Sequence, residues 1–304
     1  VPCKMLEPFL SINPSLSKHP FLEYIVLISY DDDNDIGYIS KLGKLVFFEK
    51  TKYSKIEIYK SKAMGTVLMI DGEIQFCTAD EFIYHEMIAH VPLAFLQKAK
   101  KVLILGGGDG GTLTEILKHK NIKKVDLVEI DERIVDISKM YFPRISKQFD
   151  NAKVNVFIEN AFDFIKDNMS THPKYYDMII QDCTDYDPDN PLYMNENIMN
   201  IKNFLKVGGI YVENFIDLFQ NINDSDIYNR YLFVKKNFKY CSIYHCGMPY
   251  YLGSMYGFII CSDTVNFSKM NINWKFLKKI DTKYYNKDIH IASFALPNYL
   301  KSLL

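Results

Sequence analysis

Arginine is scarce in this chain of 304 residues, which holds only Arg133, Arg144 and Arg230. Because arginine forks are common ligands of phosphate groups, their scarcity argues against a phosphorylated substrate. Lysine and arginine together number 36 against 37 aspartates and glutamates, and neither sign is gathered into a stripe or a tail. A formal net charge of −1 without a basic patch argues against nucleic acid as a partner.

Cysteine pairs and long apolar runs are also lacking. None of the six cysteines stands in a CxxC pair, which favours reduced thiols over a disulfide framework or a structural zinc site. No apolar run reaches the length of a membrane span, and the first ten residues do not resemble a secretion signal. We therefore expect a cytoplasmic protein with no membrane partner.

The composition is that of a folded protein, with 48% hydrophobic and 24% charged residues, and the length predicts a main domain plus a smaller one. Residues 1–36 mix proline, serine and apolar residues without a period and end in an acidic run, which predicts a poorly ordered arm. Residues 37–77 hold short β-rich runs with turns at Gly65 and Asp71-Gly72, which predicts a small antiparallel β domain. The main domain is then expected over residues 78–304.

Strand and helix patterns alternate through this main domain. A capping box, Thr78 to Glu81, opens a helix that Pro92 is expected to bend or end. Strand-like KVLIL, VDLVEI, VNVFI, DMIIQD and GIYVENF are separated by helical stretches near 112–120, 132–141, 161–168, 195–206 and 222–237. The alternation predicts an α/β fold with a doubly wound parallel sheet. Two later runs, 241–251 and 255–263, are typical of antiparallel strands at the edge of such a sheet.

A glycine-rich loop follows the first of these strands. Gly106 to Gly111, interrupted only by Asp109, precede a helix, and Glu129 ends the next strand. Such glycines let a ligand approach the backbone, and a carboxylate at the second strand end accepts hydrogen bonds from ribose hydroxyls. A nucleoside-bearing ligand is expected, although the spacing leaves a nicotinamide dinucleotide and an S-adenosyl compound both open. Asp109 would repel a pyrophosphate and therefore favours a cationic ligand.

More acidic residues follow the fourth strand, where a doubly wound sheet opens its cleft. Asp182 and Asp185 lie there with Cys183 and Thr184 between them. Together with Asp109 they suggest an amine-binding site, while the alternative role for strand-end aspartates is helix capping. Cys183 has no base near it in sequence that would make it a nucleophile.

A zinc helix is not expected. His85 and His90 are five residues apart, whereas two ligands on one helix face need a spacing of four. We expect these histidines to line a cleft or to pack.

Six blocks of the sequence form one ordered set. They are MGTVLMIDGEIQ, DEFIYHEMIAHVP, VLILGGGDGG, VEID, IIQDCTD and KYYNKDIHIASFALP. This set resembles the polyamine aminopropyltransferase family, most closely its spermidine synthases, over about residues 37–300. The resemblance implies a Rossmann-like, class I methyltransferase-type catalytic domain and an N-terminal β domain that joins chains into a homodimer or homotetramer. It also implies transfer of an aminopropyl group from decarboxylated S-adenosylmethionine to putrescine, with no prosthetic group and no metal ion.

The resemblance further assigns roles to single residues. Asp182 matches the general base of the family, and Tyr84, His85, Asp185 and Tyr251 match positions of the amine site. Asp109 matches the residue that holds the propylamine of the donor, and Glu129 matches the ribose ligand. The remaining donor-contact positions of the family correspond here to Ser54, Gly106, Gly108, Asn160, Ala161 and Pro188.

Several positions depart from the family pattern. Ser54, Thr114, Asn160 and Asn214 replace other family residues, and Tyr186 follows the second aspartate in a loop that is one residue shorter. We expect Tyr186 to point inward and to hold the acceptor site to a four-carbon diamine, the alternative being that it turns outward and covers the cleft. Two alternatives stay open: a transferase with another amine acceptor or with intact S-adenosylmethionine as a methyl donor, and a non-catalytic member of the family.

Overall fold

The computed structural model describes residues 25–31, 36–184, 193, 195–218, 225–251 and 255–303. The chain forms two compact units. The first consists of residues 1–81 with 250–252, and the second consists of residues 82–249 with 253–304. No helix in the described part of the chain is both long enough and apolar enough to cross a membrane.

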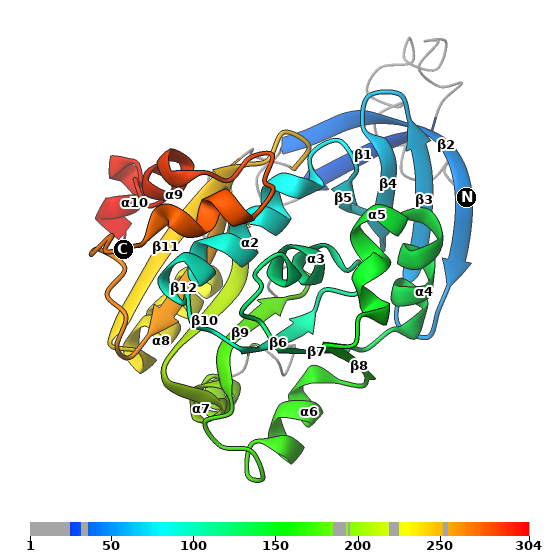
Figure 1. The fold of residues 1–304 in the computed structure, drawn as a ribbon. Helices are drawn as coiled ribbons and strands as arrows, with labels where there is room; N and C mark the ends of the chain where they lie inside the picture. The colour runs from blue at the N-terminus through cyan, green and yellow to red at the C-terminus, as the bar shows by residue number, and fades with distance from the viewer. Residues whose placement is uncertain are drawn as a thin grey trace. The chain divides into compact units, whose positions relative to one another are not determined.

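The first unit is a five-stranded antiparallel sheet whose strands lie in chain order (Figure 1). The strands are β1 (Ile25–Asp31), β2 (Ile36–Lys50), β3 (Lys55–Ser61), β4 (Gly65–Ile70) and β5 (Glu73–Cys77). Its small core is built from alternating residues of these strands, among them Tyr59, Val67 and Met69. Residues 66–69 of β4 are all buried, and of these Val67 and Met69, which point to the same face, belong to this core.

Strand β1 corrects the sequence interpretation. It lies within residues 1–36, where we expected a poorly ordered arm, and that expectation is wrong for Ile25–Asp31. The strand pairs with β2 from Ile25↔Gly43 to Asp31↔Ile36, and Asp31 is its last residue. The run IVLISYD has no polar alternation, and its pairing partner determines its structure more than its own pattern does. Residues 1–24 of the expected arm lie outside the described residues.

The second unit contains a seven-stranded sheet in the order β11-β12-β10-β9-β6-β7-β8. The strands are β6 (Lys101–Gly106), β7 (Lys124–Glu129), β8 (Val154–Ile158), β9 (Tyr176–Asp182), β10 (Leu205–Asp217), β11 (Tyr240–Gly247) and β12 (Met255–Ser262). The first five are parallel neighbours, and β12 pairs antiparallel with both β10 and β11. This confirms the predicted α/β fold with antiparallel strands at one edge.

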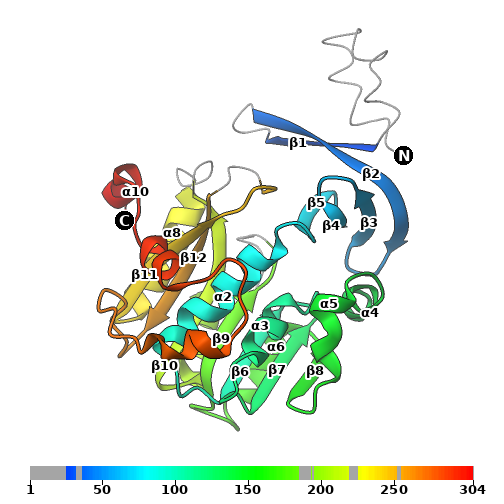
Figure 2. The same ribbon diagram turned by 45° about the horizontal axis from the view of Figure 1, so that its top comes forward.

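Helices cover both faces of this sheet (Figures 1 and 2). They are α2 (Glu81–Phe95), α3 (Gly111–Leu117), α4 (Glu132–Tyr141), α5 (Pro143–Ser146), α6 (Ala161–Asn168), α7 (Asn195–Phe204), α8 (Ser225–Asn237), α9 (Lys287–Ser293) and α10 (Asn298–Leu303), with short 3-10 turns at Lys147–Asp150 and Trp274–Lys279. On the edge strands, Ile243 and Ile259 join the core shared with α6, α7 and α8. The rings of Tyr244 and Phe258, which alternate with them, stack on the opposite face, where Tyr244 donates to the Met87 carbonyl of α2.

Helix α2 continues past Pro92 to Phe95. We expected this proline to bend or end the helix, and the helix ends within one turn of it. Proline removes one backbone donor and crowds the preceding turn, so a helix end nearby is its usual consequence.

The strand order creates a switch point beside β6. The chain passes from β6 through α3 to β7 on one side, whereas β9 pairs with β6 on the other side. Connections that leave neighbouring strands in opposite directions open a crevice at the carboxyl ends of those strands. The residues that follow β6, β7 and β9 are therefore the first place to look for a site.

Candidate active site

Three carboxylates lie at the carboxyl ends of three adjacent strands. Asp182 is the last residue of β9 and is paired in register with Gly106, the last residue of β6. Asp109 lies in the loop after β6, and Glu129 is the last residue of β7. The fold thus brings together acids that are separated by up to 73 residues in sequence.

Asp182 is nine-tenths buried, with 9% of its surface exposed. The Tyr84 hydroxyl donates to Asp182 Oδ1 at 2.6 Å, whereas Oδ2 has no hydrogen-bond partner among the described residues. Burial raises the pKa of Asp182, the charge of Asp109 raises it further, and the Tyr84 hydroxyl opposes the rise. The Thr112 hydroxyl also faces this carboxylate and favours its ionised form, but its geometry falls short of a hydrogen bond.

Asp109 has the opposite environment. Its Oδ1 lies 3.3 Å from Nε2 of the buried His85 ring and accepts from the Gly111 N–H at 2.6 Å. Burial disfavours the ionised form of Asp109, but His85 and the backbone donor outweigh it, so the pKa of this carboxyl falls below its ordinary value. With the pKa values of Asp109 and Asp182 pushed apart, one carboxylate stays charged while the other is ready to take up a proton.

Glu129 is held by backbone donors at both oxygens. Gly108 N–H donates to Oε2 at 3.1 Å, and Asp131 N–H donates to Oε1 at 3.0 Å. Burial still raises the pKa of Glu129 to about 7, because the backbone donors only partly replace the water that the carboxylate loses.

The glycine loop is shaped by close contact with these side chains. A Cβ on Gly111 would lie 2.2–2.4 Å from three atoms of the His85 ring, and a Cβ on Gly108 would lie 2.5 Å from Glu129 Oε2. Both distances are below any that real Cβ atoms adopt, so these two positions require glycine for contact rather than for backbone freedom.

Two alternative chemistries find no support in the geometry. Burial raises the pKa of the Cys183 thiol well above its ordinary value, and Glu129 and Asp182 raise it further, which opposes a thiolate nucleophile. His90 contacts His119 at 3.0 Å and Glu115 at 3.1 Å in a buried packing network. Among the residues that the structure describes, no three His, Cys, Asp or Glu side chains are grouped as a metal site would need.

Comparison with known proteins identifies the family. The model of the "Spermine/spermidine synthase domain" matches residues 81–271, and the model of the "Spermidine synthase tetramerisation domain" matches residues 26–78. The chain belongs to the spermine/spermidine synthase family.

Relatives within the spermine/spermidine synthase family match most of the chain. The polyamine aminopropyltransferase of Buchnera aphidicola subsp. Schizaphis graminum is 37% identical over 278 residues, covering 88% of this chain and 94% of that protein. The polyamine aminopropyltransferase of Caldicellulosiruptor saccharolyticus is 35% identical over 272 residues, covering 89% and 95%.

Solved spermidine synthases share the fold. The crystal structure of spermidine synthase from Thermotoga maritima aligns with a TM-score of 0.84 at 31% identity, over 93% of this chain and 94% of that one. A spermidine synthase crystallised in complex with the transition state analogue AdoDATO aligns with a TM-score of 0.84 at 30% identity, over 93% and 95%. Family membership and fold therefore rest on nearly the whole length of the chain.

Other residues matched to the spermine/spermidine synthase family lie in several places. Asn160 is exposed at the start of α6, where its side-chain oxygen accepts from Phe162 N–H at 2.8 Å, and Ala161 is the first residue of that helix. The helix cap uses one lone pair of the Asn160 oxygen and leaves the other for a ligand.

Two predicted residues belong to the first unit. Ser54 closes the turn between β2 and β3, where its N–H donates to Thr51 Oγ1 at 3.1 Å and its carbonyl accepts from Thr51 N–H at 2.8 Å. The Tyr251 hydroxyl donates to the Gln75 carbonyl on β5. Asp185, Tyr186 and Pro188 lie outside the described residues, and the roles predicted for them stay predictions.

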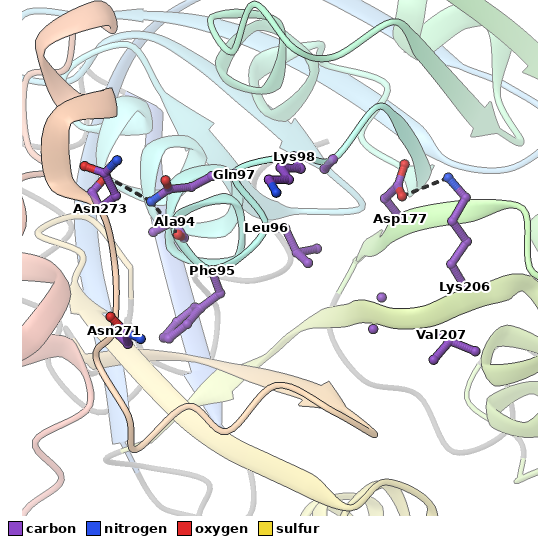
Figure 3. A pocket seen from close by; sticks show the side chains of 13 residues that line it. Ala94, Phe95, Leu96, Gln97, Lys98, Asp177, Lys206, Val207, Asn271 and Asn273 are labelled. Atoms are coloured by element: carbon purple, nitrogen blue, oxygen red, sulfur yellow. Dashed lines mark hydrogen bonds and ion pairs between the residues drawn. The ribbon is translucent and has the colours of Figure 1, made fainter.

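A cavity of about 420 Å³ lies elsewhere in the second unit (Figure 3). It is lined by residues 94–99 at the end of α2, by Asp177, by residues 206–209, and by Asn271 and Asn273. Asp177 and Lys206, which form an ion pair at 2.8 Å, stand near the starts of β9 and β10. The cavity is therefore at the opposite end of these strands from Asp182.

Sequence reasoning missed several buried polar residues near the site. Glu86, next to His85 on α2, accepts from the backbone N–H groups of Lys283, Tyr284 and Tyr285 at 2.7–2.9 Å. Arg230 pairs with Glu213 of β10 at 2.7 Å, with both side chains buried. The available signal was a glutamate within the otherwise apolar strand GIYVENF, because a charge buried there needs a partner.

Proposed function

We propose that this chain is a spermidine synthase, which transfers the aminopropyl group of decarboxylated S-adenosylmethionine to putrescine and releases methylthioadenosine. The observation that carries the proposal is the pair of carboxylates at the ends of β9 and β6, with the pKa of Asp182 raised and that of Asp109 lowered. Family membership and the AdoDATO complex of a structural neighbour support it.

Asp109 is the proposed ligand of the donor's cationic propylamine. Its low pKa keeps it charged, and the cation attracts it. Intact S-adenosylmethionine would bring a carboxylate to the same place, where like charges repel. Glu129 is proposed to accept from the ribose hydroxyls, and Gly106, Gly108, Asn160, Ala161, Ser54 and Pro188 are the further donor contacts proposed from the family.

Asp182 is the proposed general base. An alkylamine has a pKa of about 10.4 and must lose a proton before its lone pair can attack. With Oδ1 held by Tyr84, the buried Oδ2 is the atom proposed to accept that proton. A raised carboxyl pKa makes Asp182 a stronger base than an exposed aspartate.

The chemical step then needs little besides orientation. The amine nitrogen forms a bond to the carbon next to the sulfonium, the carbon–sulfur bond breaks, and its electron pair neutralises the sulfur. Methylthioadenosine leaves as a neutral thioether, and the product nitrogen keeps its two remaining protons as a secondary ammonium, because the first proton has already passed to Asp182. In-line positioning of the two substrates is therefore expected to supply much of the rate enhancement.

The acceptor site is proposed to include Tyr84, His85, Asp185 and Tyr251, with Tyr186 limiting its length to four carbons. Tyr84 and His85 approach the paired acids directly, since each contacts one of them. A hydroxyl beside a carboxylate suits a primary ammonium or amine group, which donates several hydrogen bonds.

We infer that the chain acts as an oligomer of identical subunits in the cytoplasm. The match of residues 26–78 to a tetramerisation domain supports the oligomer. Val46 and Phe48, two residues apart on β2, are 37% and 56% exposed in the isolated chain. Exposed apolar side chains on one strand face are typical of surfaces that a partner covers.

The test is release of methylthioadenosine by purified protein with decarboxylated S-adenosylmethionine and a panel of putrescine, cadaverine, agmatine and spermidine. We expect the highest kcat/KM with putrescine. Preference for another amine would assign a different acceptor. Methyl transfer from intact S-adenosylmethionine, or binding of the nucleoside without turnover, would contradict the proposal.

A further inference from the structure

The backbone around Asp182 is held by polar side chains from other elements. The Gly107 N–H donates to the Asp182 carbonyl at 2.8 Å. Asn214 of β10 brackets the next residue, donating from Nδ2 to the Cys183 carbonyl at 2.8 Å and accepting from the Cys183 N–H at 3.4 Å. The Tyr193 hydroxyl donates to the Thr184 carbonyl at 2.8 Å. Residues 182–184 are thus fixed from three directions.

Arg230 lies behind this arrangement. It is 4% exposed and reaches out from α8, donating from Nη1 to the Tyr193 carbonyl at 2.8 Å. Its guanidinium also lies over the Tyr193 ring, 5.5 Å from the ring centroid. One side chain therefore holds both the backbone and the ring of the residue that holds Thr184.

Arg230 is held in turn by a bidentate ion pair with Glu213. Nε donates to Glu213 Oε1 at 3.2 Å, and Nη2 donates to Oε2 at 2.7 Å. The Tyr211 hydroxyl lies 2.5 Å from the same Oε2 and 2.9 Å from Gln181 Oε1. Gln181 immediately precedes Asp182. The Arg230–Glu213 ion pair is therefore also connected to Asp182 through Tyr211 and Gln181.

A role in stability alone does not explain this design. Removing two charges from water costs more than most buried pairs regain, and apolar residues of similar volume are often as stable. What an ion pair with a planar fork adds is a fixed direction for each hydrogen bond. Tyr193 and Tyr211, which contact Arg230 and Glu213, in turn hydrogen-bond Thr184 and Gln181, on either side of Asp182.

We propose that Arg230 is a positioning residue for Asp182, acting through Tyr193 on Thr184 and through Glu213 and Tyr211 on Gln181. The inference rests on the proposed role of Asp182 as the general base. It predicts that loosening either branch moves the base relative to the amine and slows the chemical step. Nucleoside affinity is expected to stay unchanged, because Glu129 is on β7, away from both branches.

The test uses single hydroxyl deletions, Tyr193→Phe and Tyr211→Phe, which keep the rings and the ion pair. The matched control is Tyr176→Phe, at the start of the same strand β9. Its buried hydroxyl donates to the carboxylate of Asp126 at 2.8 Å. Loss of this hydroxyl is expected to lower stability, but it removes no hydrogen bond to Gln181 or to residues 182–184.

We expect kcat to fall on the order of tenfold in Tyr193→Phe and in Tyr211→Phe, with the Kd of methylthioadenosine within about twofold of wild type. In Tyr176→Phe we expect kcat to stay within about twofold of wild type, even if its melting temperature falls as much. Equal losses of kcat in all three variants, or none in the first two, would overturn the positioning role.

Asp182→Asn is assayed in parallel to separate the two proposals. If it keeps wild-type turnover, the assignment of the base fails regardless of Arg230. If it is inactive while Tyr193→Phe and Tyr211→Phe behave like Tyr176→Phe, only the positioning role fails.

Discussion

The residue scale is where two aspartates acquire different chemistry. Asp109 contacts a ring nitrogen of His85 and accepts a hydrogen bond from a backbone N–H, and these interactions lower its pKa despite its burial. Asp182 is also buried but lies near the charge of Asp109, so both burial and this charge raise its pKa. Identical side chains thus support charge attraction in one case and proton transfer in the other.

Nucleoside binding should depend on pH through Glu129. Its pKa is raised to about 7, and a ribose hydroxyl donates better to the ionised carboxylate. Affinity for methylthioadenosine should therefore weaken as the pH falls below 7 and level off above it. Calorimetry at pH 6 in buffers of different ionisation enthalpy should show proton release on binding.

The matched control for this experiment is Glu129→Gln, which cannot ionise. It should bind methylthioadenosine weakly at every pH and without proton release. A wild-type affinity that is flat between pH 6 and pH 8 would contradict the role of Glu129.

Part of the site could be predicted from sequence because the ends of the buried strands are marked by polar residues that follow apolar runs. Asp109, Glu129 and Asp182 each follow an apolar run, and parallel strands bring their carboxyl ends to one edge. Arg230 and Glu213 could not be paired in this way, because no local pattern relates a helix residue to a strand residue 17 positions earlier. The pKa difference between the acids also escaped prediction, since it depends on the His85 ring and on burial.

At the scale of single elements, the start of α3 packs directly against the His85 ring of α2. Gly111 is the first residue of α3, and the His85 ring occupies the place of its missing Cβ. Helix propensity would favour alanine at this position by up to about 1 kcal/mol. Contact between two helices, rather than propensity, therefore explains the glycine.

The effect of Gly111→Ala on the free energy of unfolding should change sign between the wild-type chain and a His85→Ala variant. In the wild-type chain we expect it to destabilise the fold by about 1–3 kcal/mol, because the His85 ring must move. In a His85→Ala background the clash is gone, and the same change should be neutral or stabilising. Urea unfolding of the four proteins measures this, and additive effects would show that the ring is not the obstacle.

Helix α6 offers a second test at the level of an element. Asn160→Asp keeps the cap on Phe162 N–H and adds a charge that the adenine amino group can donate to. We expect methylthioadenosine to bind several-fold more tightly, with an unchanged melting temperature. Unchanged or weaker binding would indicate that the nucleoside contacts other residues.

At the scale of the whole molecule, the alternation of strands and helices made the sheet predictable, whereas β1 was missed. The parallel strands are bounded by helices with a clear period, but IVLISYD pairs only with its neighbour in an antiparallel sheet. A strand that is defined mainly by pairing with a neighbour is harder to predict from sequence than a strand within repeating βα units.

Association of whole chains is expected to appear as a multiple of 35.5 kDa in light scattering. Substituting Phe48→Lys on the exposed face of β2 should shift that mass toward a single chain without unfolding the second unit. A monomeric wild type at micromolar concentration would contradict the inferred oligomer.

The measurement that bears most directly on the proposed function compares aminopropyl transfer to putrescine by the wild-type chain and by Asp182→Asn. Asparagine keeps the size of the side chain and can still accept from Tyr84, but it cannot take up the proton of the amine. We predict a kcat lower by on the order of a hundredfold or more, with the Kd of methylthioadenosine nearly unchanged. Near-wild-type turnover in a folded Asp182→Asn would contradict the role of Asp182 and the mechanism built on it.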